Sequence, residues 1–300
     1  MVEIPEDFAR GTVAREADRG REWIAGLPTL VDELLQRWDC VPEAAVVHGQ
    51  VGVVLPVREG EGRSAVLKVS FPHPGNVHEP DAFAVWRGRG AVRLYARDDA
   101  RFAMLLERAE PRSLAEVPDV EDEAVALAGA LARRLAVPAP AELPRLRDQA
   151  EPWATELRAD LAELAQPLPA RTVDAALATL AELGPDEPDT LVHGDLHFTN
   201  VLASAREPWL AIDPKGYVGD PAYDTATLLR GRYEDLLAAP DFKAALLRRV
   251  AVFADAAGID RERARRWAQY RAVTAAVWGR RHGDPDWVVR ATDVLADLLV

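Results

Sequence analysis

The sequence predicts an α+β fold with two lobes, a small antiparallel sheet carrying one helix and then a larger, mainly helical part. Segments rich in β-branched residues occupy 44–57 and 64–71, and strand-like segments follow at 91–98 and 101–109. From about residue 120, apolar residues recur at helical spacing. The exception is 190–213, where two short apolar runs joined by a turn predict a hairpin. We expect lobes of 1–107 and 108–300.

The individual elements follow from the residue pattern in chain order. Residues 21–38 carry large apolar side chains at helical spacing, and Pro28 is expected to kink or divide this helix. The charged, Gly-rich stretch 58–63 predicts a turn, and 79–87 predicts a helix with Pro80 in its first turn. Further helices are predicted at 120–137, 154–165, 172–183, 222–238, 242–257, 261–278 and 286–299, with proline-rich connections at 137–144 and 166–171.

Composition limits the classes of function. The chain has 300 residues, 49% of them hydrophobic, which is enough for a sizeable core. The absence of a run of about 18 apolar residues and the charged first twenty residues predict a cytoplasmic protein without a membrane span. The single cysteine, Cys40, excludes a disulfide within the chain. A net charge of −13 argues against nucleic-acid binding and is compatible with a cationic small molecule. We expect a monomer.

Lysine is rare in this chain, which uses arginine for nearly all its positive charge. It occurs only at Lys68, Lys215 and Lys243. Strand alternation over 64–71 places Lys68 on the opposite face from Leu67 and Val69. Glu79 begins the next predicted helix and could pair with Lys68, holding it toward a phosphate. The simpler interpretations are a solvent-facing lysine and a helix N-terminal acid favoured by the helix dipole.

The segment 191–202, LVHGDLHFTNVL, and the strand after it bring oxygen-bearing side chains together. Asp195 and Asn200 have the spacing D-x-x-x-x-N, and Asp213 ends the next apolar run. A hairpin would turn Asn200 and Asp213 toward each other, and two hard oxygen ligands suit Mg²⁺. A carboxylate nearby could accept a proton from an attacking hydroxyl. These are the parts that phosphoryl transfer to an alcohol requires.

Other functions fit the sequence less well. His193, Asp195 and His197 could ligate a transition metal, as in the G-D-x-H opening of metallophosphoesterases, but the later motifs of those enzymes are absent. The sequence has no G-x-S-x-G motif, which a serine hydrolase of the nucleophile-elbow type needs. It also has no Walker-A motif, which a P-loop NTPase needs.

Two blocks carry a resemblance to a known family. VHGDLHFTNVL (192–202) and AIDPKGYVGDPAYD (211–224) resemble the catalytic and metal-binding loops of the aminoglycoside phosphotransferase superfamily, which shares the protein-kinase fold. The similarity points to the streptomycin 6-kinase and hydroxyurea kinase branch. It extends to 21–31, 65–70, 86–98 and 103–114, nearly the whole chain. The chain departs from the kinase pattern in having no G-x-G-x-x-G.

The resemblance implies a role for each matching residue. Asp195 would be the catalytic base or orient the acceptor hydroxyl, and Asn200 and Asp213 would bind Mg²⁺. Lys68 would contact the phosphates of ATP and Glu79 would orient Lys68. The hinge facing the adenine would include Glu107 and Ala109, and the supporting residues of the catalytic loop would be His193, Asp220 and Asp224.

The same resemblance implies a two-lobed, protein-kinase-like enzyme that phosphorylates a hydroxyl of an aminoglycoside antibiotic such as streptomycin. Hydroxyurea, a sugar or another metabolite is the alternative acceptor, and a nucleotide-binding pseudokinase is the non-enzyme alternative. Candidate acceptor-binding residues are Glu234, Trp278, Asp284 and Trp287. Trp278 is followed by Gly279, Arg280 and Arg281, where streptomycin kinases tend to carry acids.

Overall fold

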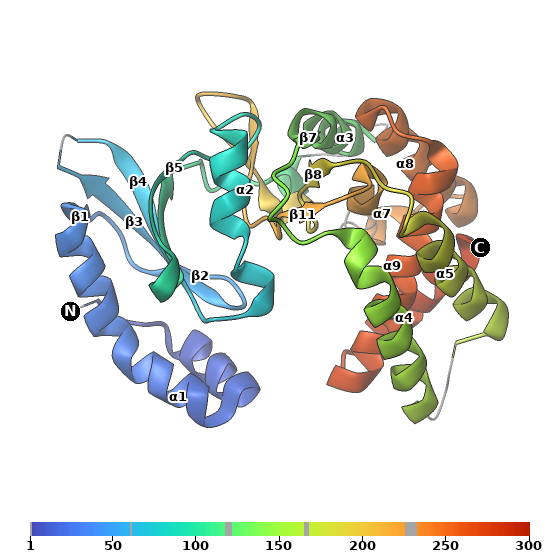
Figure 1. Cartoon of the computed structure of the whole chain (residues 1–300), viewed down its shortest axis with the longest axis horizontal. Helices are drawn as coiled ribbons and strands as arrows, with labels where there is room; N and C mark the ends of the chain where they lie inside the picture. Colours follow the sequence, from blue (N-terminus) through green and yellow to red (C-terminus); the bar gives the residue numbers. More distant parts are fainter. Residues whose placement is uncertain (1, 61, 118–121, 165–167, 226–232) are drawn as a thin grey trace. The chain divides into compact units, whose positions relative to one another are not determined.

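The computed structural model describes residues 2–60, 62–117, 122–164, 168–225 and 233–300. By its internal packing the chain divides into two compact units, Met1–Glu110 and Pro111–Val300. Figure 1 shows the sheet in the first unit and the helices that make up most of the second. In the described part of the chain, no helix is both long and apolar enough to cross a membrane.

The first unit is built on a six-stranded antiparallel sheet. The strands are β1 (Cys40–Pro42), β2 (Val47–His48), β3 (Gly52–Glu59), β4 (Ser64–Ser70), β5 (Leu94–Asp98) and β6 (Ala103–Glu107). Their order is β1-β3-β4-β6-β5, and β2 also pairs with β3. The long β3–β4 ladder brings Val54 opposite Lys68, and β6 on the other side of β4 brings Met104 opposite the same lysine. Lys68 therefore lies on a central strand.

A helix lies on each face of this sheet, and the two faces differ in polarity. Helix α1 (Glu6–Arg37) packs Leu27, Val31 and Leu34 against the face that carries Leu67 and Val69. Helix α2 (Glu79–Trp86) has Pro80 in its first turn and belongs to the opposite side, where Lys68 meets Glu79. The prediction from strand alternation is confirmed: Leu67 and Val69 are buried together on the side away from Lys68. Short 3₁₀ turns occupy Pro74–Asn76 and Asp99–Arg101.

The second unit surrounds its small strands with helices. The helices are α3 (Glu123–Leu135), α4 (Leu146–Glu163), α5 (Ala170–Leu183), α7 (Tyr233–Leu237), α8 (Phe242–Ala257), α9 (Arg261–His282) and α10 (Asp286–Leu298). The apolar faces of α4, α5, α7, α8, α9 and α10 share one core, in which Trp267 and Tyr270 of α9 are nearly fully buried. A three-stranded sheet has the order β11-β8-β7, with β7 at Val137–Pro138, β8 at Thr190–Val192 and β11 at Tyr217–Val218. The hairpin consists of β9 (Val201–Ala203) and β10 (Trp209–Ala211).

Most predicted elements are present, and three predictions were wrong in detail. The first helix begins at Glu6 rather than at residue 21. Helical dihedral angles break at Ala17 and not at Pro28. The segment 44–57 forms two strands, β2 and β3. Of the helix predicted at 222–238, a 3₁₀ turn at Pro221–Asp224 and α7 are seen, and 226–232 lie outside the described residues.

Candidate active site

The loop between β8 and β9 is held by a buried carboxylate. Asp224, in the 3₁₀ turn that follows β11, accepts the backbone N–H of His193 on one oxygen (2.9 Å) and that of Gly194 on the other (2.7 Å). Gly194 has φ +82°, a conformation that costs other residues energy. Burial raises the pKa of Asp224 to about 7, and the two N–H donors act against this rise. The loop is thus fixed at the position that precedes Asp195.

His193 supports the loop and is not a metal ligand here. Its side chain is fully buried, its Nε2 lies 2.9 Å from the carbonyl oxygen of Ile212, and its Nδ1 accepts the backbone N–H of Asp195 at 3.2 Å. Burial lowers the pKa of His193 to about 4, so the ring is neutral at neutral pH. Both ring nitrogens are engaged with backbone, which leaves neither for a metal ion.

The β9–β10 hairpin brings Asn200 next to the residue that precedes Asp213. Val201 pairs with Ala211, and the N–H of Ile212 donates to the carbonyl oxygen of Asn200 at 2.9 Å, which extends the ladder by one residue. The amide nitrogen of Asn200 donates to the carbonyl oxygen of Asp195 at 3.0 Å. Asp213 has φ +58°, an unusual conformation for a non-glycine residue and one that concentrates at functional sites.

The side-chain oxygens at these two positions are hard donors of the kind that Mg²⁺ prefers. Because the amide nitrogen of Asn200 is used within the loop, the remaining side-chain atom for a ligand is the amide oxygen. Asp213 supplies a carboxylate one residue beyond the ladder. Two protein oxygens are enough for Mg²⁺, which keeps phosphate oxygens and water in its other positions.

Lys215 was not assigned a role from the sequence, yet it contacts both acids of the site. Its ammonium lies 3.8 Å from Oδ2 of Asp195 and 3.7 Å from Oδ2 of Asp213. The signal that could have found it is its rarity, since the chain has only three lysines. The Nε2 of His197 lies 3.9 Å from the same oxygen of Asp195, while its Nδ1 lies 2.7 Å from the hydroxyl of Thr199.

Asp220 supports the site one step further away. One carboxylate oxygen caps the following 3₁₀ turn by accepting the N–H of Ala222, and the other accepts from Trp267 Nε1 at 2.9 Å and from Arg263. It therefore ties the turn that carries Asp224 to helix α9, and it does not itself contact the catalytic loop in the way that Asp224 does.

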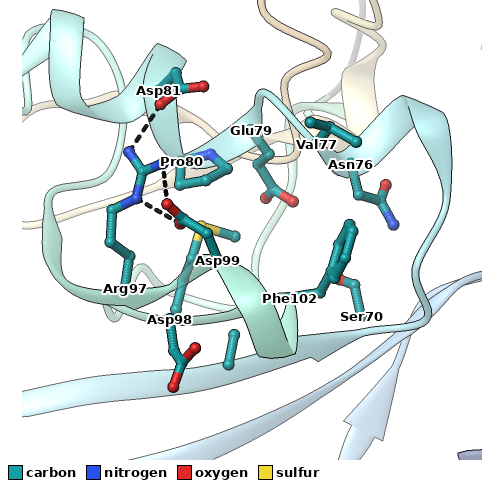
Figure 2. A pocket seen from close by; sticks show the side chains of 12 residues that line it. Ser70, Asn76, Val77, Glu79, Pro80, Asp81, Arg97, Asp98, Asp99 and Phe102 are labelled. Atoms are coloured by element: carbon teal, nitrogen blue, oxygen red, sulfur yellow. Dashed lines mark hydrogen bonds and ion pairs between the residues drawn. The ribbon is translucent and has the colours of Figure 1, made fainter.

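In the first unit, Lys68 and Glu79 form a short ion pair. Nζ of Lys68 donates to Oε1 of Glu79 at 2.6 Å, and the glutamate side chain is only 1% exposed. Figure 2 shows the Glu79 carboxylate among the residues that line a cavity between α2 and the β5–β6 end of the sheet. The volume of this cavity is about 200 Å³. On the same helix, Asp81 is held by Arg97 at 2.8 Å. The ion pair compensates for placing the Lys68 charge, whose side chain is only 12% exposed, on a central strand.

The predicted hinge residues lie at the end of β6 and just beyond it. Glu107 is the last residue of this strand, and its N–H donates to the carbonyl oxygen of Arg93 at 2.8 Å. Its side chain accepts the N–H of Arg93 in return, at 3.0 Å. Ala109 lies two residues beyond the strand and is half-buried. The N–H of Glu107 is therefore committed within the sheet.

The candidate acceptor-binding residues are mostly exposed. Trp278 is 52% exposed and stacks on His282, and Trp287 is 59% exposed. Asp284 is half-buried at the start of the turn into α10, where its N–H donates to the carbonyl oxygen of Gly279. Glu234 is exposed on α7. The turn thus brings Asp284 back against Gly279, the residue after Trp278, while Glu234 belongs to a separate helix.

The fold and the two groups of side chains define the class of protein. A protein-kinase-like phosphotransferase has two such parts. One is an antiparallel sheet that carries a Lys–Glu ion pair. The other is a helical unit with Asp195 in a loop and a hairpin that has Asn200 just before it and Asp213 just after it. Residues 37–283 match the family model described as aminoglycoside/hydroxyurea antibiotic resistance kinase. The chain belongs to this family.

Relatives and solved structures agree with this assignment. Streptomycin 6-kinase of Streptomyces glaucescens is 39% identical over 93% of this chain and 91% of its own. Hydroxyurea phosphotransferase of Kitasatospora aureofaciens is 35% identical over 98% of this chain and 86% of its own. Among structures, macrolide 2'-phosphotransferase MphH from Brachybacterium faecium has a TM-score of 0.57 at 16% identity, covering 91% of this chain and 98% of its own. This last likeness concerns the fold alone.

Proposed function

We propose that this chain transfers the γ-phosphoryl group of ATP to a hydroxyl of a streptomycin-like aminoglycoside, with Mg²⁺ as cofactor. The observation that carries the proposal is the hairpin that aligns Asn200 with Ile212, next to Asp213 and bonded to the Asp195 loop. Two relatives named streptomycin 6-kinase, at 39% and 34% identity over more than nine-tenths of the chain, support the acceptor class.

In this proposal each residue has a distinct task. Asp195 orients the acceptor hydroxyl or accepts its proton. Asn200 and Asp213 would hold Mg²⁺, which neutralises charge on the phosphates. Lys68, held by Glu79, contacts the phosphates, and the backbone of Glu107 and Ala109 faces the adenine. Rate acceleration comes from positioning and from electrostatic stabilisation of charge on the transferred group. The functional lobes are 1–107 and 108–300, acting as a cytoplasmic monomer.

The acceptor would lie against the late helices, at Trp278, Asp284 and Trp287, with Glu234 as a further candidate. The two arginines after Trp278 do not add free positive charge there. Arg280 makes a bidentate pair with Asp293, at 2.8 and 2.7 Å, and Arg281 pairs with Asp160. A cationic acceptor is therefore not excluded by them, and the net charge of −13 favours one.

A second acceptor, hydroxyurea, is favoured by one observation. The hydroxyurea phosphotransferase of Kitasatospora aureofaciens matches 98% of this chain. Hydroxyurea is much smaller than an aminoglycoside and would need none of the exposed tryptophans. Sugars and other metabolites with a free hydroxyl are the remaining acceptors of the same reaction class.

The test is a coupled assay of ADP release by the purified full-length chain. Streptomycin, other aminoglycosides, hydroxyurea and amino sugars are supplied in turn, with and without Mg²⁺, and the product is located by ³¹P NMR. We expect Mg²⁺-dependent turnover with streptomycin or a close analogue. Turnover of hydroxyurea alone would select the second acceptor. A chain that binds nucleotide but turns over no member of the panel would favour a pseudokinase.

A further inference from the structure

The backbone of Lys215 is hydrogen-bonded to the catalytic loop. Its N–H donates to the carbonyl oxygen of His193 at 2.7 Å. Its side chain then runs over Gly194, where a Cβ would lie 3.0 Å from Cβ and 3.5 Å from Cγ of Lys215. The absence of a side chain at Gly194 is what allows the lysine to lie this close. The aliphatic part of Lys215 is therefore positioned by packing.

The ammonium of Lys215 reaches both acids without forming a hydrogen bond to either. The distances of 3.8 Å to Asp195 and 3.7 Å to Asp213 are those of ion pairs, longer than the 2.6 Å between Lys68 and Glu79. An ammonium has three donors, and these contacts leave its donors available to a third anion. The Lys215 side chain is 23% exposed, so such an anion has access.

The place of this ammonium matters because it lies beside both acids that act in the proposed reaction. In the proposed reaction the acceptor hydroxyl is at Asp195, and the phosphates are anchored at Asp213. If Asp213 holds the metal ion, its carboxylate would no longer neutralise the Lys215 ammonium, which now lies 3.7 Å away. The negatively charged phosphoryl group would then be a further partner for the ammonium, beside the Asp195 carboxylate at 3.8 Å.

We propose that Lys215 is a catalytic residue whose ammonium contacts the oxygens of the γ-phosphoryl group during transfer. The inference rests on the proposed function. The acceptor oxygen forms a bond to phosphorus while the bond from phosphorus to the β-phosphate oxygen breaks, and ADP leaves. The hydroxyl proton goes to Asp195. Lys215 keeps its proton throughout and stabilises the charge on the oxygens being transferred.

The scarcity of lysine supports a specific use. The chain has 36 basic side chains of lysine and arginine, and lysine stands only at 68, 215 and 243. Two of these three positions carry an acid partner in the candidate site. A lysine presents a compact charge with donors that rotate, which suits contact with a group that moves, whereas arginine has a fixed planar fork.

The experiment compares Lys215→Met with the matched control Lys243→Met, which removes an exposed lysine on α8. Calorimetry measures the affinity of each full-length protein for Mg·ADP and for a Mg-bound, non-hydrolysable ATP analogue. For Lys215→Met we expect ADP affinity within about twofold of wild type and analogue affinity lower by about tenfold. We expect kcat to fall by at least about 100-fold. Lys215→Arg, which keeps the charge, should recover part of kcat.

The outcomes separate this proposal from the proposed function. If wild type binds and turns over ATP while Lys215→Met behaves like Lys243→Met, the role of Lys215 is wrong and the kinase function stands. Equal loss of ADP and analogue binding would mean a merely structural lysine and would also overturn it. Should Lys215→Met not fold, Lys215→Gln serves for the same comparison. Wild type that binds neither nucleotide overturns both proposals.

Discussion

Lys68 and Glu79 are joined by a hydrogen bond of 2.6 Å, and the glutamate is almost completely excluded from water. Removing one partner of a buried pair leaves an uncompensated charge, which is more costly than never having had the pair. The pair therefore fixes the position of the Lys68 ammonium.

The first prediction concerns this pair. Glu79→Gln keeps the shape of the side chain and removes its charge, so Lys68 is no longer held in one place. We expect the KM for ATP to rise by about tenfold. The matched control is Asp81→Asn, on the same helical turn, whose partner Arg97 has a second acid at Asp99. A KM for Glu79→Gln as low as that of the control would contradict the role of Glu79.

The second prediction isolates proton acceptance from binding. Asp195→Asn preserves the loop, because the bonds of residue 195 to His193 and Asn200 use backbone atoms. We expect kcat to fall by about 10²–10⁴-fold, the usual contribution of general base catalysis. Nucleotide affinity should stay within about twofold of wild type. Asp189→Asn, an exposed acid just before β8, is the control. Activity of Asp195→Asn near the control value would mean that another group receives the proton.

The third prediction tests Asp213 as a metal ligand. Asp213→Asn removes the charge, and asparagine, like aspartate, tolerates φ +58° better than most non-glycine residues. We expect the Mg²⁺ concentration for half-maximal rate to rise by at least about tenfold at saturating nucleotide, since one charged oxygen ligand is lost. Excess Mg²⁺ should restore part of the rate. A Mg²⁺ dependence identical to wild type would place the metal ion elsewhere.

The fourth prediction concerns the close approach at Gly194. Gly194→Ala must keep φ +82°, and the new Cβ would lie 2.9 Å from a ring carbon of Tyr217 and 3.0 Å from Cβ of Lys215. Gly283→Ala is matched in backbone, with φ +73°, but nothing lies within 4 Å of its Cβ position. Both changes should cost about 1–3 kcal/mol of folding free energy from backbone strain. Only Gly194→Ala should also lower kcat, and equal kcat in the two variants would refute the contact.

Local sequence patterns predicted much of this site. Two apolar runs separated by a polar turn were enough for the β9–β10 hairpin, because antiparallel neighbours need only a short connection. Strand alternation placed Lys68 on the correct face. The pairing of β7, β8 and β11 joins two- and three-residue strands that are far apart in the chain. Such short segments have no readable periodicity, and their pairing depends on the packing of the helices around them.

Lys215 was missed for a similar reason. It follows Pro214 in a loop, where neither helical nor strand periodicity indicates the direction of a side chain. Its relation to Asp195 depends on the N–H of Lys215 bonding to the carbonyl of His193, a contact between segments that are not neighbours in sequence. The helix Glu6–Arg37 was also longer than predicted. The residues before Trp23 are mostly charged and bury little apolar surface, so that part of the helix has no clear apolar periodicity in the sequence.

The last prediction concerns pH and the two buried groups that support the loop. Burial raises the pKa of Asp224 from 3.8 to about 7, so the folded state binds a proton more tightly than the unfolded state. This contribution to stability is complete below pH 3.8 and is lost as the pH rises through 7. Burial lowers the pKa of His193 from 6.5 to about 4, so its contribution has the opposite sign and increases from pH 4 to 6.5.

In the wild type these two dependences oppose each other over the same pH range. Asp224→Asn removes only the first, so the stability of the variant relative to wild type should improve steadily from pH 4 to pH 7. Even at pH 8 the variant should remain less stable, by about 1–3 kcal/mol, because the amide offers one acceptor to the two N–H groups of His193 and Gly194. Urea unfolding of both proteins across this range measures the difference. A difference that does not change with pH would mean that Asp224 has an ordinary pKa and is ionised throughout, held so by its two backbone donors.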